Sequence, residues 1–88
     1  MEGTGNRIVE VRVPDNLWPR RRDWKGRIVS IFKKPGEKVA QGEAIAEVEI
    51  EKAIIAIESP SSGIVEEVRV GAGDPVGPGD VIMRLREV

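Results

Sequence analysis

The sequence predicts an all-β domain: a flattened β-barrel or sandwich of two four-stranded antiparallel sheets related by a pseudo-twofold axis. Three observations lead to this fold class. First, three glycines recur 37 residues later in the chain: Gly26, Gly36 and Gly42 return as Gly63, Gly73 and Gly79. Second, aromatic residues make up only 3% of the chain, so the core must consist of Val, Ile, Leu and Ala, which favours strands. Third, no run of ten residues has helical spacing of its apolar positions.

Composition excludes several classes of function. The 88 residues can form one domain, and the balance of 14 basic against 15 acidic residues offers no basis for binding nucleic acid or an anionic membrane. The chain has no cysteine and no histidine, which excludes disulfides, thiolate or histidine metal sites and histidine-based catalysis by this chain alone. No apolar run is long enough to span a membrane, and the lack of cysteine favours the cytoplasm.

The elements are expected to follow the repeat. Residues 1–6 are polar and glycine-rich and are expected to form a flexible N-terminus before a domain over residues 7–88. Each repeat unit then predicts a strand, a glycine turn, a short strand, a second glycine turn and another strand. Seven further positions agree in residue class at the same offset: Ile28 with Val65, Ile31 with Val68, Glu37 with Asp74, Val39 with Val76, Glu43 with Asp80, Ile45 with Ile82, and Val48 with Leu85.

Between the two units, residues 46–58 predict a β-hairpin. Apolar and acidic side chains alternate from Ala46 to Glu51, and residues 53–58 form a second run that favours a strand. With Glu51 and Lys52 as central turn residues, the predicted cross-strand pairs are Ile50 with Ala53, Glu49 with Ile54, Val48 with Ile55, Glu47 with Ala56, and Ala46 with Ile57. Burial of the apolar face determines this register, because a slip by one residue would turn that face to water.

The hairpin turn presents Lys52 at its tip. It lacks the Asn-Gly or Gly-Gly pair common in tight hairpins, so we expect a type I turn with negative φ at Glu51 and Lys52. A lysine at a loop tip usually only keeps the tip soluble. A lysine displayed on a rigid scaffold is also what the covalent attachment of a cofactor requires.

These features, taken together, resemble the biotinyl/lipoyl attachment domain family, and within it the lipoyl domain of 2-oxo acid dehydrogenase acyltransferase (dihydrolipoamide acyltransferase) subunits. The resemblance covers residues 8–85 and implies the barrel-sandwich hybrid fold of lipoyl domains. The matching stretches are Gly26-Arg27-Ile28-Val29, Lys34-Pro35-Gly36-Glu37-Lys38-Val39, Gly42-Glu43-Ala44-Ile45, Glu47-Val48-Glu49-Ile50-Glu51-Lys52-Ala53, Ser59-Pro60-Ser61-Ser62-Gly63-Ile64-Val65 and Gly73-Asp74-Pro75-Val76.

The residues beside Lys52 resemble the lipoyl branch of the family. Lipoyl domains typically have an acidic residue before the modified lysine and alanine after it, as Glu51 and Ala53 are here, whereas biotin carriers have methionine on both sides. The family's usual residue before the lysine is Asp, so Glu51 departs by one methylene. The resemblance implies lipoic acid in amide linkage on Lys52, with biotin as the alternative cofactor, and recognition of the site through Glu51 and Ala53.

The resemblance also implies partners. These are a lipoate ligase or lipoyl transferase, a thiamine-dependent 2-oxo acid decarboxylase, an acyltransferase catalytic domain, and dihydrolipoamide dehydrogenase. The chain would carry acyl groups and electrons between them as a swinging arm and would not be an enzyme by itself. A fragment of a longer subunit is expected rather than a free-standing carrier. The alternatives are a biotin carboxyl carrier domain of a carboxylase and an unmodified structural or adaptor barrel.

Two other features invite hypotheses. The carboxylates of Glu47, Glu49 and Glu51 lie on one face of a strand, but alternate residues are about 6.6–6.8 Å apart, too far to converge on a metal ion. Residues 15–25 contain Arg20, Arg21 and Arg22 between Trp18 and Trp24. By resemblance this loop lies beside the modified lysine, and the three arginines are a candidate contact for the decarboxylase. The alternatives are single-stranded nucleic acid binding, and tryptophans that cap the barrel while the arginines face water.

Overall fold

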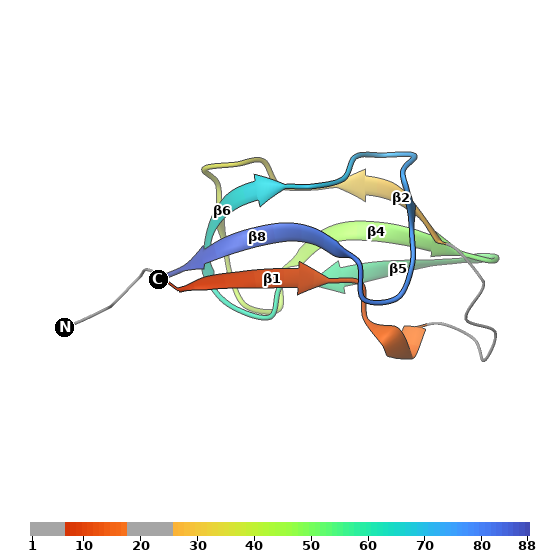
Figure 1. Ribbon diagram of the computed structural model, residues 1–88, viewed down its shortest axis with the longest axis horizontal. Coiled ribbons are helices and arrows are strands. Elements are labelled where there is room, and N and C mark those ends of the chain that lie inside the picture. The colour runs from red at the N-terminus through yellow and green to blue at the C-terminus, as the bar shows by residue number, and fades with distance from the viewer. Residues whose placement is uncertain (1–6, 18–25) are drawn as a thin grey trace.

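The computed structural model describes residues 7–17 and 26–88 of the chain, and over these residues it confirms the predicted all-β fold (Figure 1). The only helix there is a single 3₁₀ turn, so no helix of the described residues is long and apolar enough to cross a membrane. The elements are β1 (Ile8–Arg12), η1 (Asp15–Leu17), β2 (Gly26–Ile31), β3 (Lys38–Val39), β4 (Ala44–Ile50), β5 (Ala53–Glu58), β6 (Gly63–Val68), β7 (Pro75–Val76) and β8 (Val81–Glu87).

The strands form two four-stranded antiparallel sheets. One has the order β1-β8-β6-β3 and is called sheet A here; the other has the order β5-β4-β2-β7 and is called sheet B. The two orders are equivalent, because β2, β3 and β4 begin and end 37 residues before β6, β7 and β8. Even the irregularities repeat: one register shift falls between Ile28 and Ser30 and its counterpart between Val65 and Glu67. The glycine repeat of the sequence is therefore a structural duplication.

The turns of the two halves are held by the same hydrogen bonds. Glu37 Oε1 accepts the backbone N–H of Lys34 at 2.7 Å, and Asp74 Oδ2 accepts that of Gly71 at 2.8 Å. Glu43 and Asp80 do the same for the backbone N–H groups of Ala40 and Gly77. The acidic pairs that matched in the sequence are thus turn residues whose carboxylates satisfy backbone donors. Gly36 and Gly73 have φ of +92° and +94°, a conformation that other residues adopt only with strain.

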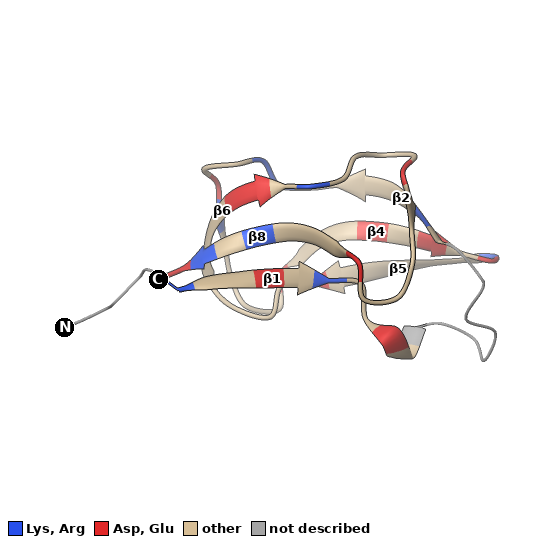
Figure 2. Ribbon diagram, viewed as in Figure 1, with Lys and Arg blue, Asp and Glu red and all other residues tan. Residues whose placement is uncertain are grey.

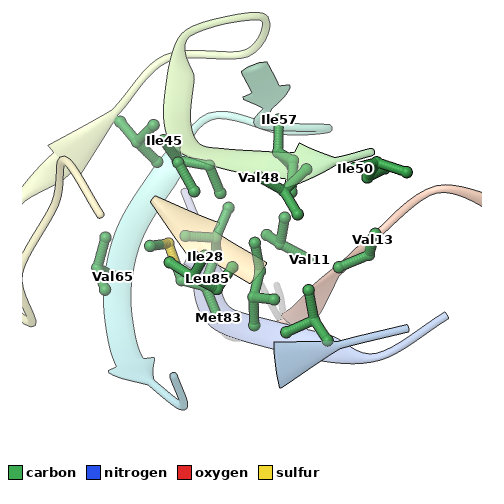
Figure 3. Close-up of a cluster of buried hydrophobic side chains, with 14 residues drawn as sticks. Val11, Val13, Ile28, Ile45, Val48, Ile50, Ile57, Val65, Met83 and Leu85 are labelled. Atoms are coloured by element: carbon green, nitrogen blue, oxygen red, sulfur yellow. The ribbon is translucent and has the colours of Figure 1, made fainter. Parts of the chain in front are cut away.

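Both sheets contribute to one apolar core (Figure 3). Period-two alternation explains the inward side chains from Ala46 to Ile50 on β4 and those of Met83 and Leu85 on β8, because every second side chain of a strand points to the same face. Ile45 and Ile82, the residues just before these runs, are buried as well. The core is aliphatic, as the scarcity of aromatic residues predicts, with one methionine. Its buried members are Val11, Val13, Ile28, Val39, Ile45, Ala46, Val48, Ile50, Ile57, Val65, Val76, Ile82, Met83 and Leu85.

The hairpin of β4 and β5 lies at one end of the molecule, and the two ends of the described barrel lie at the other (Figure 1). At that far end the backbone N–H of Glu87 donates to the carbonyl of Arg7 at 2.8 Å. This position is the symmetry counterpart of the hairpin tip, since Glu87 follows Ile50 by 37 residues. The hairpin tip and the ends of the described residues, Arg7 and Val88, therefore lie at opposite ends of the molecule.

Candidate functional site

The β4–β5 hairpin positions Lys52, and its register agrees with the sequence prediction at every predicted pair. Ile50 pairs with Ala53, Glu49 with Ile54, Val48 with Ile55, Glu47 with Ala56, and Ala46 with Ile57. Ala46 and Val48 are fully buried and Ile50 is nearly so, whereas Glu51, Lys52 and Ala53 are exposed. The β4 arm is thus anchored in the core up to the residue before the turn, whereas β5 is anchored through the buried Ile57 and the half-buried Ile55.

The turn itself differs from the expectation of type I geometry. Glu51 has a φ of +57° and is the only non-glycine residue with positive φ in the described part of the chain. Positive φ at the first central residue alone is the sign pattern of a type II′ turn, whose twist matches the right-handed twist of the flanking strands, whereas a type I turn would splay them. The predicted type I turn is wrong because the strand twist outweighs the steric preference of Glu51.

Lys52 follows this constrained residue and is exposed. Within residues 7–17 and 26–88, no ion pair engages its ammonium group. Among the described residues, no ion pair therefore competes for Nζ, which faces water. The chemistry available at the tip is that of one primary amine on a flexible four-carbon side chain, held at a rigid corner.

Three glutamates near Lys52 are divided between the strand and the turn. Glu47 and Glu49 lie on the outward side of β4, and Glu51 lies in the turn. No group of three or more acidic, cysteine or histidine side chains in the described ranges is arranged to hold a metal ion. Glu47, Glu49 and Glu51 thus form a charged part of the surface beside Lys52.

Other residues proposed from the sequence lie elsewhere. The candidate contacts Arg20, Arg21 and Arg22, with Trp18 and Trp24, fall outside the described residues. Of residues 15–25, the structure describes the first three, which form η1 with exposed side chains.

Sequence reasoning missed two features of sheet B, one near Lys52 and one at the far end of β4. One is Ile54, whose side chain is 59% exposed two residues after Lys52. The predicted register places it on the outward side of β5, opposite Glu49, but the sequence alone does not show how exposed it is. The other is the ion pair between Lys33 Nζ and Glu43 Oε2 at 2.8 Å, which joins the end of β2 to the turn before β4. It has no local pattern in the sequence, because its partners are brought together only by the turn between them.

Comparison with known proteins agrees with this geometry. A family model described as "Biotin-requiring enzyme" matches residues 22–85. The chain is 37% identical over 79 residues to a dihydrolipoyllysine-residue acetyltransferase component of the pyruvate dehydrogenase complex from Pseudomonas aeruginosa, covering 90% of this chain and 14% of that protein. It is 38% identical over 77 residues to the corresponding Azotobacter vinelandii protein, covering 88% of this chain and 11% of the relative. The chain therefore spans about one seventh or less of the length of these relatives.

Solved structures agree on the fold. The lipoyl domain of the 2-oxoglutarate dehydrogenase complex from Azotobacter vinelandii matches with a TM-score of 0.69 and 26% identity, over 88% of this chain and 96% of that one. A multi-domain long-chain acyl-CoA carboxylase matches with a TM-score of 0.75 at 18% identity, over all of this chain and 8% of that one, which is a likeness of fold alone. The chain therefore belongs to the biotin/lipoyl attachment family and is a carrier domain, not an enzyme by itself.

Proposed function

We propose that this domain carries lipoic acid in amide linkage on the Nζ of Lys52 and serves as the swinging arm of a 2-oxo acid dehydrogenase complex. The observation that carries the proposal is the exposed Lys52 at the tip of a hairpin that is anchored in the core through β4 and Ile57. Glu51 before it and Ala53 after it fit the lipoyl pattern better than the methionine-flanked pattern of biotin carriers. The similarity to acetyltransferase components of pyruvate dehydrogenase complexes supports the same choice.

The protein's part in this function is to position the lysine. Six cross-strand pairs stiffen the hairpin, and the buried Val48 and Ile57 fasten it to sheet A through the shared core. A rigid corner keeps the attached arm extended from the protein surface. The full length of the arm can then reach successive active sites, where its effective concentration is high. When attached, the dithiolane ring supplies the acyl-transfer and redox chemistry that this chain lacks. The partners proposed are a lipoate ligase or lipoyl transferase, the decarboxylase, the acyltransferase domain and dihydrolipoamide dehydrogenase.

Intact mass spectrometry tests the proposal. The domain is coexpressed with lipoate ligase and biotin ligase in medium containing both cofactors. We expect a single lipoyl-sized mass gain, absent in Lys52→Arg and retained in the control Lys38→Arg, which alters another exposed lysine. A biotinyl-sized gain would assign the chain to the biotin carriers, and a domain with no gain would be an unmodified barrel. A gain that persists in Lys52→Arg would move the site elsewhere.

A further inference from the structure

The two outward sheet faces carry opposite charges at symmetry-related positions. The outward residues of β8 are Arg84 and Arg86, and the outward residues of β4, 37 positions earlier, are Glu47 and Glu49. Figure 2 shows basic segments on β8 and acidic segments on β4. Because the two halves share one fold, the ion pairing of the charged residues on β8 can be compared directly with that on β4.

On sheet A the two central arginines each lie within ion-pair distance of a carboxylate of the domain. Arg86 Nε lies 3.1 Å from Glu66 Oε2, and Arg84 Nη1 lies 3.8 Å from Glu67 Oε1. Glu10 on β1 is in register with Arg84 on the other side. The outer face of sheet A is therefore a set of paired charges, which presents little net charge to a partner.

On sheet B no residue of 7–17 and 26–88 forms an ion pair with the equivalent carboxylates. Glu49 lies in register between Ile54 and Arg27, but Nη1 of Arg27 donates to the carbonyl of Gly73 at 3.0 Å. Glu47 lies between Ser30 and Ala56, neither of which is charged. Neither carboxylate forms an ion pair with another described residue. Both lie on β4, which pairs with a strand on each side, so the positions of their backbones are fixed.

Apolar side chains border these carboxylates on the same face. Ile54 is 59% exposed on β5, and Val29, in the irregular segment of β2, is 36% exposed. Single exposed apolar side chains are ordinary on a protein surface, but these two lie on either side of Glu47 and Glu49, close to Lys52. The face combines what protein interfaces use: charge that selects and orients a partner, and apolar area that excludes water once the partner binds.

The outer face of sheet B that is formed by Glu47, Glu49, Val29 and Ile54 is called the docking face here. We propose that the docking face binds the decarboxylase that acylates the group on Lys52. The matching surface of that enzyme would present Arg or Lys side chains around a small apolar patch. This inference rests on the proposed function. Amide formation removes the positive charge of Lys52 beside the carboxylates, so the loaded domain presents a more negative surface than the unloaded one and is bound in preference to it.

Steady-state kinetics of the loaded domain tests the docking face. The substrate is the lipoylated domain, and the enzyme is the decarboxylase component of the pyruvate dehydrogenase complex of the same organism. We expect Glu47→Gln/Glu49→Gln to lower kcat/KM for the domain about tenfold at low ionic strength and to reduce its salt dependence. The matched control Glu66→Gln/Glu67→Gln, which removes the same charge from sheet A, should change kcat/KM less than about twofold. Ile54→Ser should lower kcat/KM at all salt concentrations.

Intact mass and urea unfolding of each variant establish equal lipoylation and folding before the kinetics are compared. Wild-type domain with no lipoyl gain would contradict the proposed function itself. A loaded wild type that the decarboxylase does not acylate would overturn the docking proposal and leave attachment on Lys52 standing. Equal effects of the two double variants, or a kcat/KM of Glu47→Gln/Glu49→Gln equal to the wild-type value, would also overturn the docking face.

Discussion

Glu51 is the residue whose conformation most directly shapes the site. Its φ of +57° lies in the left-handed region, which costs an L-residue with a Cβ about 1–2 kcal/mol. A glycine would avoid this cost, yet the turn contains Glu. The carboxylate at this position is thus held next to Lys52 at the expense of backbone strain, which supports the proposal that a modifying enzyme recognises Glu51.

Replacing Glu51 should separate the strain from the carboxylate. We expect Glu51→Gly to be more stable than Glu51→Ala by about 1 kcal/mol, because both lack the carboxylate and only alanine keeps the Cβ that clashes at positive φ. Urea denaturation of both variants and the wild type measures this difference. An alanine variant as stable as the glycine variant would mean that the turn does not hold this φ in solution.

The ion pair of Lys33 and Glu43 is a second residue-scale feature. The bond from Lys33, followed by the backbone N–H of Ala40, lowers the pKa of Glu43 from its usual 4.5. The same bond to Glu43 raises the pKa of Lys33 from 10.5. A lowered carboxyl pKa stabilises the fold above about pH 4.5 and loses this effect as pH falls through the folded value; a raised lysine pKa stabilises below about pH 10.5 and loses its effect as pH rises.

Glu43→Gln should therefore change how stability depends on pH. The wild type is expected to exceed the variant in free energy of unfolding at neutral pH. The difference should shrink below about pH 4.5 and again above about pH 10.5, as each partner loses its charge. Urea titrations across this range measure it, with Glu58→Gln on β5 as the control, because Glu58 is exposed and forms no ion pair with another described residue. A difference that is constant over the whole range would show that the ion pair does not contribute.

At the scale of elements, the close approach of strands explains the glycines that begin β2 and β6. A Cβ on Gly63 would lie 2.5 Å from the carbonyl oxygen and 3.0 Å from the carbonyl carbon of Arg86, both in the backbone of β8. At the equivalent Gly26 the nearest atom is 3.0 Å away and belongs to the side chain of Val48. The pairing of β6 with β8 therefore depends on the missing side chain more than the pairing of β2 with β4 does.

Alanine substitutions should show how much the stability of the fold depends on each of these glycines. We expect Gly63→Ala to lower the free energy of unfolding by about 2 kcal/mol or more, because β8 must shift, and Gly26→Ala to lower it less. Gly71→Ala, where a Cβ meets nothing within 4 Å, should stay within about 0.5 kcal/mol of wild type. Chemical denaturation of the three variants checks the order. Equal losses at Gly63 and Gly71 would contradict the close approach.

At the scale of the whole molecule, the two halves share one core and are expected to unfold together. Ile45 of sheet B and its counterpart Ile82 of sheet A are both fully buried. A core that both sheets complete gives neither half an independent hydrophobic interior. The hairpin carrying Lys52 therefore draws its rigidity from sheet A as well as from its own strands.

Truncating one isoleucine should weaken both sheets. We expect Ile45→Ala and Ile82→Ala each to cost about 2–5 kcal/mol, a large part of the stability of so small a domain. Native-state hydrogen exchange should show amide protection falling in both sheets for either variant. Loss of protection confined to the mutated sheet would indicate two separately stable halves.

Much of the fold could be predicted because its determinants are local. The alternation from Ala46 to Glu51 predicts one buried face, and burial permits a single register for the hairpin. The turn glycines predict bends because they tolerate positive φ. The turn type escaped prediction because Glu51 has its unusual φ only under the twist of two paired strands. The contact of Gly63 with Arg86 escaped because it joins separate strands of sheet A.

The sequence by itself determined the duplication, the aliphatic two-sheet fold, the hairpin register and the place of Lys52. The duplication is visible directly as the repeat at an offset of 37 residues, and turn glycines and period-two alternation act within a few residues. Tertiary structure alone decided which charges are paired. Arg84 and Arg86 find carboxylates on neighbouring strands, while Glu47 and Glu49, in the same places of the other half, meet apolar and neutral side chains and an arginine turned toward a backbone carbonyl. Charge pairing depends on neighbours across strands, and those neighbours are set only when the sheets assemble.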